Sequence, residues 1–90
     1  MSDRPYVSSL GHLSPMIAAD AFVDISARLI GDVSVESEAS IWPGAVLRAD
    51  EDKIIIGKGS AVLDLCLIEA PKGYPVRIAP AALISHNGSP

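Results

Sequence analysis

The sequence predicts an all-β protein built as a parallel solenoid, in which short strands wind into stacked coils. Three observations predict this fold class. Aliphatic residues recur every six positions, a small residue stands two positions before most of them, and prolines with few strong helix formers disfavour long helices. Stacked thin layers also suit 90 residues that are 49% hydrophobic but contain one Trp, two Tyr and one Phe, because such a chain lacks the large rings of an ordinary small core.

The six-residue period covers most of the chain, in three blocks separated by two changes of phase. The first change, of three residues, falls across 50–53, and the second falls across 70–77. The aliphatic positions are Ile17, Val23, Leu29, Val35, Ile41, Leu47, Ile56, Val62, Ile68, Ile78 and Ile84. The small positions are Ala21, Ala27, Val33, Ala39, Ala45, Ser60, Cys66, Ala82 and Gly88.

The direction of side chains along a strand shows which residues of each six-residue repeat point inward. Residues two apart on a strand point to the same face, so each hexad predicts a short strand with two inward residues, followed by a corner. Repeated strands and corners stack in parallel, each coil burying the face of the next. A β-sandwich with ordinary alternation is the competing fold, and the sustained period favours the solenoid. We expect a strand or cap over 1–16 and the repeat over 17–90.

Charge and composition exclude several classes of function. The net charge is −4, and the seven Lys and Arg residues are scattered, so no basic patch is expected to bind nucleic acid. No apolar run reaches the roughly 18 residues of a membrane span, and no signal peptide is visible. Cys66 has no second cysteine to pair with, and its small inward position predicts a buried, inert thiol. We therefore expect a cytoplasmic protein.

Several stretches resemble the γ-class carbonic anhydrase-like family. They are Ile30–Val33, Ser40–Asp50 (SIWPGAVLRAD), Ile54–Gly57, Val62–Asp64, Gly73–Val76 and Ile84–Asn87. The resemblance implies a left-handed parallel β-helix of hexapeptide repeats, with three hexads to a turn. It gives this chain about three to four coils, and we expect no C-terminal helix.

The same resemblance allows the metal site to be tested residue by residue. Active members hold zinc or iron through three histidines at a trimer interface, where the metal lowers the pKa of bound water. Glu69 stands at the first histidine position, Leu63 replaces a glutamine that orients the hydroxide, and His86 matches the second histidine. The third position falls beyond Pro90. His86 is therefore the candidate metal ligand, and we expect no cofactor, with zinc or iron as the alternative. His12 is expected at the surface.

A charged cluster supplies the remaining candidates. Arg48 and Asp50 match the family's Arg-Gly-Asp segment, with Ala49 in place of glycine. The resemblance implies ion pairs across subunits, and we expect Arg48 to pair with Asp64. If the chain is an enzyme, Arg48, Asp64 and Glu69 are its candidate catalytic residues.

The preferred function is that of a truncated relative of the γ-carbonic anhydrases that lacks their activity. It would act as a structural or interaction module whose partner is itself, as a trimer or an end-to-end dimer. One alternative is a carbonic anhydrase with a site rebuilt from Glu69 and His86. Another is an acyltransferase of the hexapeptide-repeat type that uses His86.

Overall fold

The protein is described by a computed structural model that covers residues 6–8 and 15–85. These residues form strands and turns and no helix, so none of them lies in a helix able to cross a membrane. The strands are β1 (Tyr6–Ser8), β2 (Met16–Ile17), β3 (Phe22–Val23), β4 (Arg28–Val35), β5 (Ser40–Ile41), β6 (Val46–Ile56), β7 (Ala61–Val62), β8 (Leu67–Glu69), β9 (Val76–Ile78) and β10 (Leu83–Ile84).

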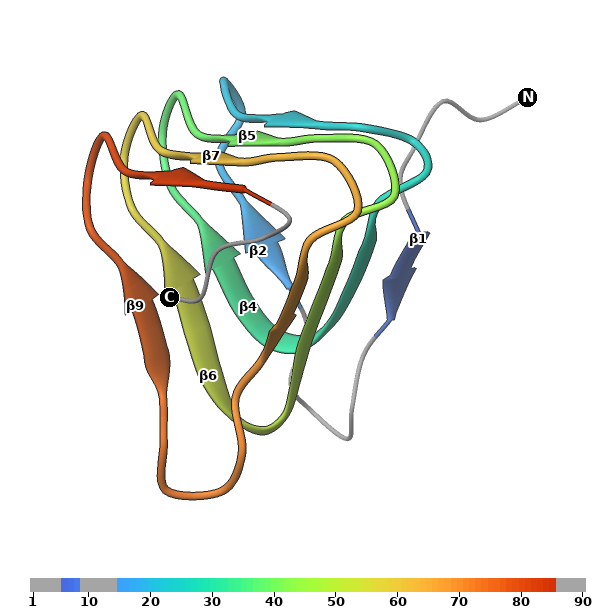
Figure 1. The fold of residues 1–90 in the computed structure, drawn as a ribbon, viewed down its shortest axis with the longest axis vertical. Coiled ribbons are helices and arrows are strands. Elements are labelled where there is room, and N and C mark those ends of the chain that lie inside the picture. The colour runs from blue at the N-terminus through green and yellow to red at the C-terminus, as the bar shows by residue number, and fades with distance from the viewer. Residues whose placement is uncertain (1–5, 9–14, 86–90) are drawn as a thin grey trace.

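The strands wind into a three-sided parallel β-helix, whose triangular outline is seen along the short dimension of the molecule (Figure 1). We call the side formed by β1, the first half of β4, the first half of β6 and β8 face 1. Face 2 contains β2, the second halves of β4 and β6, and β9. Face 3 contains β3, β5, β7 and β10. All pairings are parallel, so the predicted solenoid is confirmed.

The register reproduces the changes of phase in the sequence. Arg28 of β4 pairs with Val46 of β6, so equivalent positions in successive coils are 18 residues apart at the start of the solenoid. The insertion at 50–53 lies within β6 and lengthens the spacing to 21 residues, as the pairing of Arg48 with Glu69 shows. The loop that precedes β9 lengthens the spacing between paired residues once more, since Ile54 of β6 pairs with Val76 of β9. Both insertions lie at the corner between faces 1 and 2, so they protrude without disturbing the strands.

The core consists of stacked columns of aliphatic side chains. On face 1, Leu29 pairs with Leu47 and Leu47 with Ile68, and all three side chains are at most 1% exposed. The small positions Ala27, Ala39, Ala45 and Cys66 are also buried, where the chain turns. Ile17 in the first coil is 37% exposed, because the inward positions of an end coil are covered from one side only. The hexad pattern therefore predicted the core correctly.

One corner brings two backbones unusually close. A Cβ placed on Gly57 would lie 2.5 Å from the carbonyl oxygen of Ile78 and 2.8 Å from the nitrogen of Pro80. Gly57 also donates its N–H to that Ile78 oxygen at 2.9 Å. A side chain has no room here, so the coil above β6 depends on glycine at this position.

Candidate functional site

Two of the candidate residues lie side by side on the outer surface of face 1. Arg48 is on β6 and Glu69 ends β8, and the parallel register makes them direct partners. Their neighbours Leu47 and Ile68 point inward and are buried, so alternation sends both charged side chains outward. The strand pattern thus positions an arginine beside the glutamate that the resemblance matches to the first ligand histidine.

Arg48 holds two carboxylates at once. Its Nη1 lies 3.1 Å from Oε2 of Glu69, and its Nη2 lies 3.0 Å from Oδ2 of Asp50. The three side chains are between 39% and 50% exposed. Each ion pair is screened by water and stabilises the fold by at most about 1 kcal/mol. The planar guanidinium fork nevertheless fixes the direction of both carboxylates.

Within one chain Arg48 binds carboxylates other than that of Asp64. Asp64 lies in the turn between β7 and β8, and no salt bridge joins it to Arg48. Glu69 and Asp50 occupy the guanidinium instead, because the register places Glu69 on the adjacent rung and Asp50 follows two residues later on the same strand side. The pairing across subunits is a separate prediction.

Cys66 is a buried thiol, as predicted. It is 3% exposed, and its Sγ lies 3.4 Å from the carbonyl oxygen of Ile84 in the next coil. Burial, assisted by the negative charge of Asp64, raises the pKa of the thiol. Because the thiolate is the nucleophilic form, this environment disfavours a catalytic role for Cys66.

The described residues do not fit the zinc or iron of active carbonic anhydrases. No group of three or more His, Cys, Asp or Glu side chains within 15–85 is placed to share a metal ion. The Glu69 carboxylate, which the resemblance matches to the first ligand histidine, already binds the Arg48 guanidinium, and a metal ion there has to displace it. His86 and His12 lie outside the described residues.

Aspartates in the corners make contacts that the sequence reasoning missed. Oδ2 of Asp52 accepts a hydrogen bond from the N–H of Gly73 at 3.0 Å and so ties together the two inserted loops. Oδ2 of Asp20 accepts one from the hydroxyl of Ser37 at 2.7 Å, across neighbouring coils. Stacked turns explain both contacts, but only the Asp24–Ser26 pair, two residues apart in one turn, carries a sequence signal, that of an Asx turn.

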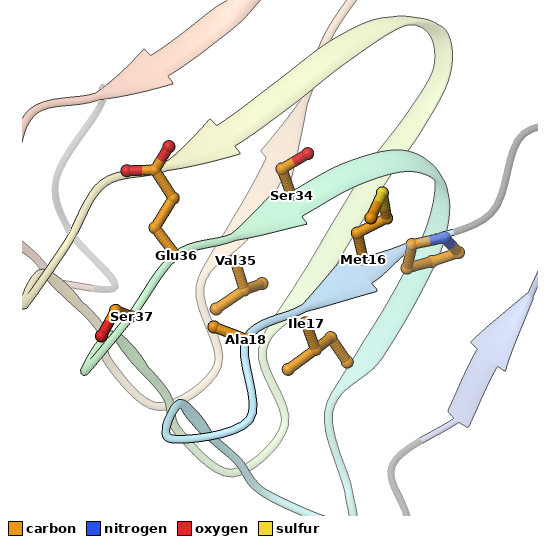
Figure 2. A pocket seen from close by; sticks show the side chains of 8 residues that line it. Met16, Ile17, Ala18, Ser34, Val35, Glu36 and Ser37 are labelled. Carbon is orange, nitrogen blue, oxygen red and sulfur yellow. The ribbon is translucent and has the colours of Figure 1, made fainter.

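An open groove lies at the first coil, on face 2. Its volume is about 590 Å³, and Figure 2 shows it between β2 and the second half of β4. The lining is mostly apolar, from Met16, Ile17, Ala18 and Val35, with Glu36 at one end. None of the candidate residues from the sequence lies in this groove.

The six-residue repeat, the three parallel faces and the buried aliphatic columns define a hexapeptide-repeat β-helix protein. No family model matches the chain. Individual relatives do: the chain is 39% identical over 72 residues to a "Probable carbonic anhydrase" of Methanocaldococcus jannaschii. It is also 39% identical over 75 residues to "Gamma carbonic anhydrase-like 1, mitochondrial" of Arabidopsis thaliana. The predicted resemblance to the γ-class carbonic anhydrase-like proteins is thereby confirmed.

A solved structure supports the same fold. The chain superposes with a TM-score of 0.70 and 30% identity on a "hexapeptide transferase family protein from Anaplasma phagocytophilum". The alignments cover 80%, 83% and 90% of this chain but 45%, 30% and 51% of the respective relatives. The chain thus spans about half or less of the length of the proteins it matches.

Proposed function

We propose that this chain is a γ-carbonic anhydrase-like assembly module that forms homo-oligomers and does not hydrate carbon dioxide. The ion pair between Arg48 and Glu69 carries this proposal. The Glu69 carboxylate lies 3.1 Å from the Arg48 guanidinium. The resemblance to the family places a metal-binding histidine of the active members at this position. A guanidinium beside this carboxylate supplies charge for protein contacts rather than an open coordination site.

The chemistry of a catalytic metal explains the conclusion about activity. Catalytic zinc needs three protein ligands and one open position. Glu69 is one donor, and a metal there has to displace Arg48, whose charge is already balanced by two carboxylates. We therefore infer that neither zinc nor iron is a resident cofactor.

Partner and location follow as parts of the same proposal. Face 1 carries Arg48, and the neighbouring corner carries Asp64, whose carboxylate makes no salt bridge within the described residues. A second copy offers Asp64 an arginine that the described residues of its own chain do not supply. The thiol of Cys66 is free and buried, which accords with a reducing compartment such as the cytoplasm.

Metal analysis tests the inactive site. The purified protein is incubated with excess zinc or, without oxygen, with ferrous iron, then passed over a desalting column. We expect less than about a tenth of an equivalent of bound metal, as the absence of three convergent ligands predicts, and carbon dioxide hydration no faster than in buffer. One equivalent of metal together with hydration activity contradicts the proposal.

Two variants identify the ligand if metal does bind. Glu69→Gln removes the carboxylate at the ligand position, and Asp50→Asn removes the other partner of Arg48. Loss of metal in Glu69→Gln but not in Asp50→Asn assigns a rebuilt metal site to Glu69.

Light scattering of the unmodified protein at micromolar concentration tests the assembly, and we expect a multiple of the chain mass of 9.4 kDa. A monomer contradicts it.

A further inference from the structure

The first coil presents a strand edge on face 2 that no described strand covers. Among the described strands, β2 pairs with β4 alone. The N–H of Ala18 donates a hydrogen bond to the carbonyl oxygen of Val35 at 2.9 Å. Because the backbone groups of successive residues in a strand point to opposite sides, the N–H and C=O of Ile17 are directed to the free edge. Such an edge is a template for a further strand.

The side chains at this edge are more exposed than their equivalents in the inner coils. Ile17 is 37% exposed, whereas Val35 and Ile56, which follow it in the same inward column, are at most 2% exposed. Met16 is 72% exposed, and Figure 2 shows Met16 and Ile17 on opposite sides of β2. A strand added at this edge therefore buries apolar surface on both of its own sides.

The carboxyl end of β2 leads into an acidic corner. The carboxylates of Asp20, Glu36 and Glu38 gather there, and Lys58 acts electrostatically on Asp20. Glu36 lines the groove beside β2, is exposed and joins neither salt bridge found within the described residues. The register places Ala18 between Glu36 and the free edge. Since Ala18 carries only a methyl group, a long cationic side chain on an added strand has a path over it to the Glu36 carboxylate.

We propose that the free edge of β2 binds an extended segment of another protein, which adds as a parallel strand with the pattern apolar, apolar, then Lys or Arg. The first side chain lies outward on Met16, the second lies inward on Ile17, and the cation reaches Glu36. The direction is that of the existing ladder, in which β2, β4 and β6 are all parallel. Main-chain hydrogen bonds supply the affinity of such an added strand, and alternate side chains supply its specificity.

This surface is separate from the contact between copies proposed above. It lies at the first coil on face 2, whereas Arg48 lies on the third coil of face 1 and Asp64 follows β7 of face 3. The inference therefore goes beyond the homo-oligomer and does not depend on it.

A short synthetic peptide tests the edge. The probe contains threonine, valine, isoleucine, arginine and threonine in that order, with both ends blocked. The protein is labelled with ¹³C in the methyl groups of its two methionines, and Met16→Leu assigns the Met16 signal. We expect this signal to shift saturably with a Kd below about 1 mM. No saturation in that range, or a shift confined to the other methionine, overturns the proposal.

Two N-methylated peptides test whether the probe adds as a strand. One rung beyond the bond from Ala18 to Val35, the arginine N–H of a parallel strand donates to the carbonyl of Ile17, while the isoleucine N–H points away. N-methylation of the arginine amide removes this donor and should weaken binding at least about tenfold. N-methylation of the isoleucine amide is the matched control and should leave the Kd nearly unchanged. Equal effects of the two contradict strand addition.

Charge variants test the role of Glu36. Glu36→Gln should weaken binding of the probe about threefold, as expected for an exposed ion pair. Glu51→Gln makes the same change of charge at the other corner of face 2 and should leave the Kd unchanged. Equal weakening by both variants contradicts a cation site at Glu36.

Light scattering with saturating probe distinguishes the partners. We expect the mass of the protein to stay that of the oligomer. A fall to one chain mass identifies a second copy as the occupant of the edge and contradicts the proposal. A monomeric protein that binds the probe overturns the homo-oligomer alone, and an oligomer that does not bind it overturns the strand site alone.

Discussion

Single residues in this fold are constrained mainly by the closeness of neighbouring coils. Within the described part of the chain, three residues other than glycine adopt the left-handed conformation in turns: Glu38, Leu65 and Ala81, with φ between 60° and 62°. A bulky residue there is strained, and Leu65 is also 74% exposed. Its N–H bonds the carbonyl of Pro43 in the coil below at 3.0 Å, which shows that stacking of turns holds the strained backbone in place.

The closest approach predicts the most sensitive glycine. Gly57→Ala places a methyl group 2.5 Å from the backbone oxygen of Ile78, which no rotation relieves, so we expect the free energy of unfolding to fall by about 3 kcal/mol. Gly59→Ala is the matched control, because its φ of +70° costs strain but no atom lies within 4 Å. Its expected loss is about 1 kcal/mol. Equal losses in urea unfolding contradict the steric explanation.

At the scale of elements, strands and turns have different sources of order. The strands are short, and their inward residues are buried in columns that run from coil to coil. The turns are polar and are joined by side chains, as Asp20 joins the turn at Ser37 and Asp52 joins the two long loops. The strands therefore depend on hydrophobic burial, and the corners depend on carboxylates that accept hydrogen bonds.

These carboxylates predict a loss of stability in acid. The hydrogen bond from Ser37 lowers the pKa of Asp20 below its usual 3.8, and the hydrogen bonds from Ser26 do the same for Asp24. A depressed pKa in the folded state contributes stability above pH 3.8 that is lost as the pH falls through the folded value. Unfolding in urea from pH 6 to pH 2 should show this loss.

A double-variant cycle assigns the acid loss to its cause. Ser37→Ala removes the largest contribution to the low pKa of Asp20, so its stability should fall less steeply with acid than that of the unmodified protein. Asp20→Asn should flatten the same part of the curve, and the pair together should add little. An unchanged slope in both variants excludes Asp20 as a source of the acid sensitivity.

At the scale of the whole molecule, the stack of coils has exposed faces and few large side chains. A chain of 90 residues buries a limited fraction of its surface, and here the large apolar residues Phe22, Trp42, Leu67 and Leu83 remain between 42% and 68% exposed. The proposed association of copies covers part of such surface.

Stability should therefore depend on protein concentration. If copies associate as proposed, mass action stabilises the folded state as concentration rises. We expect the Tm of the unmodified protein to rise by several degrees between about 1 and 100 μM. Differential scanning fluorimetry across this range provides the measurement. A constant Tm for the unmodified protein contradicts association through any face.

The sequence alone determined the period, the inward columns, the position of both inserted loops and the resemblance to γ-carbonic anhydrases. These features follow from side-chain direction along one chain, which a six-residue spacing fixes. Only the tertiary structure decided that Arg48 binds Glu69 and Asp50 rather than Asp64, that Asp52 joins the loops and that Gly57 lies against Ile78. Such contacts join neighbouring rungs, and the lengths of the inserted loops set which residues of those rungs meet.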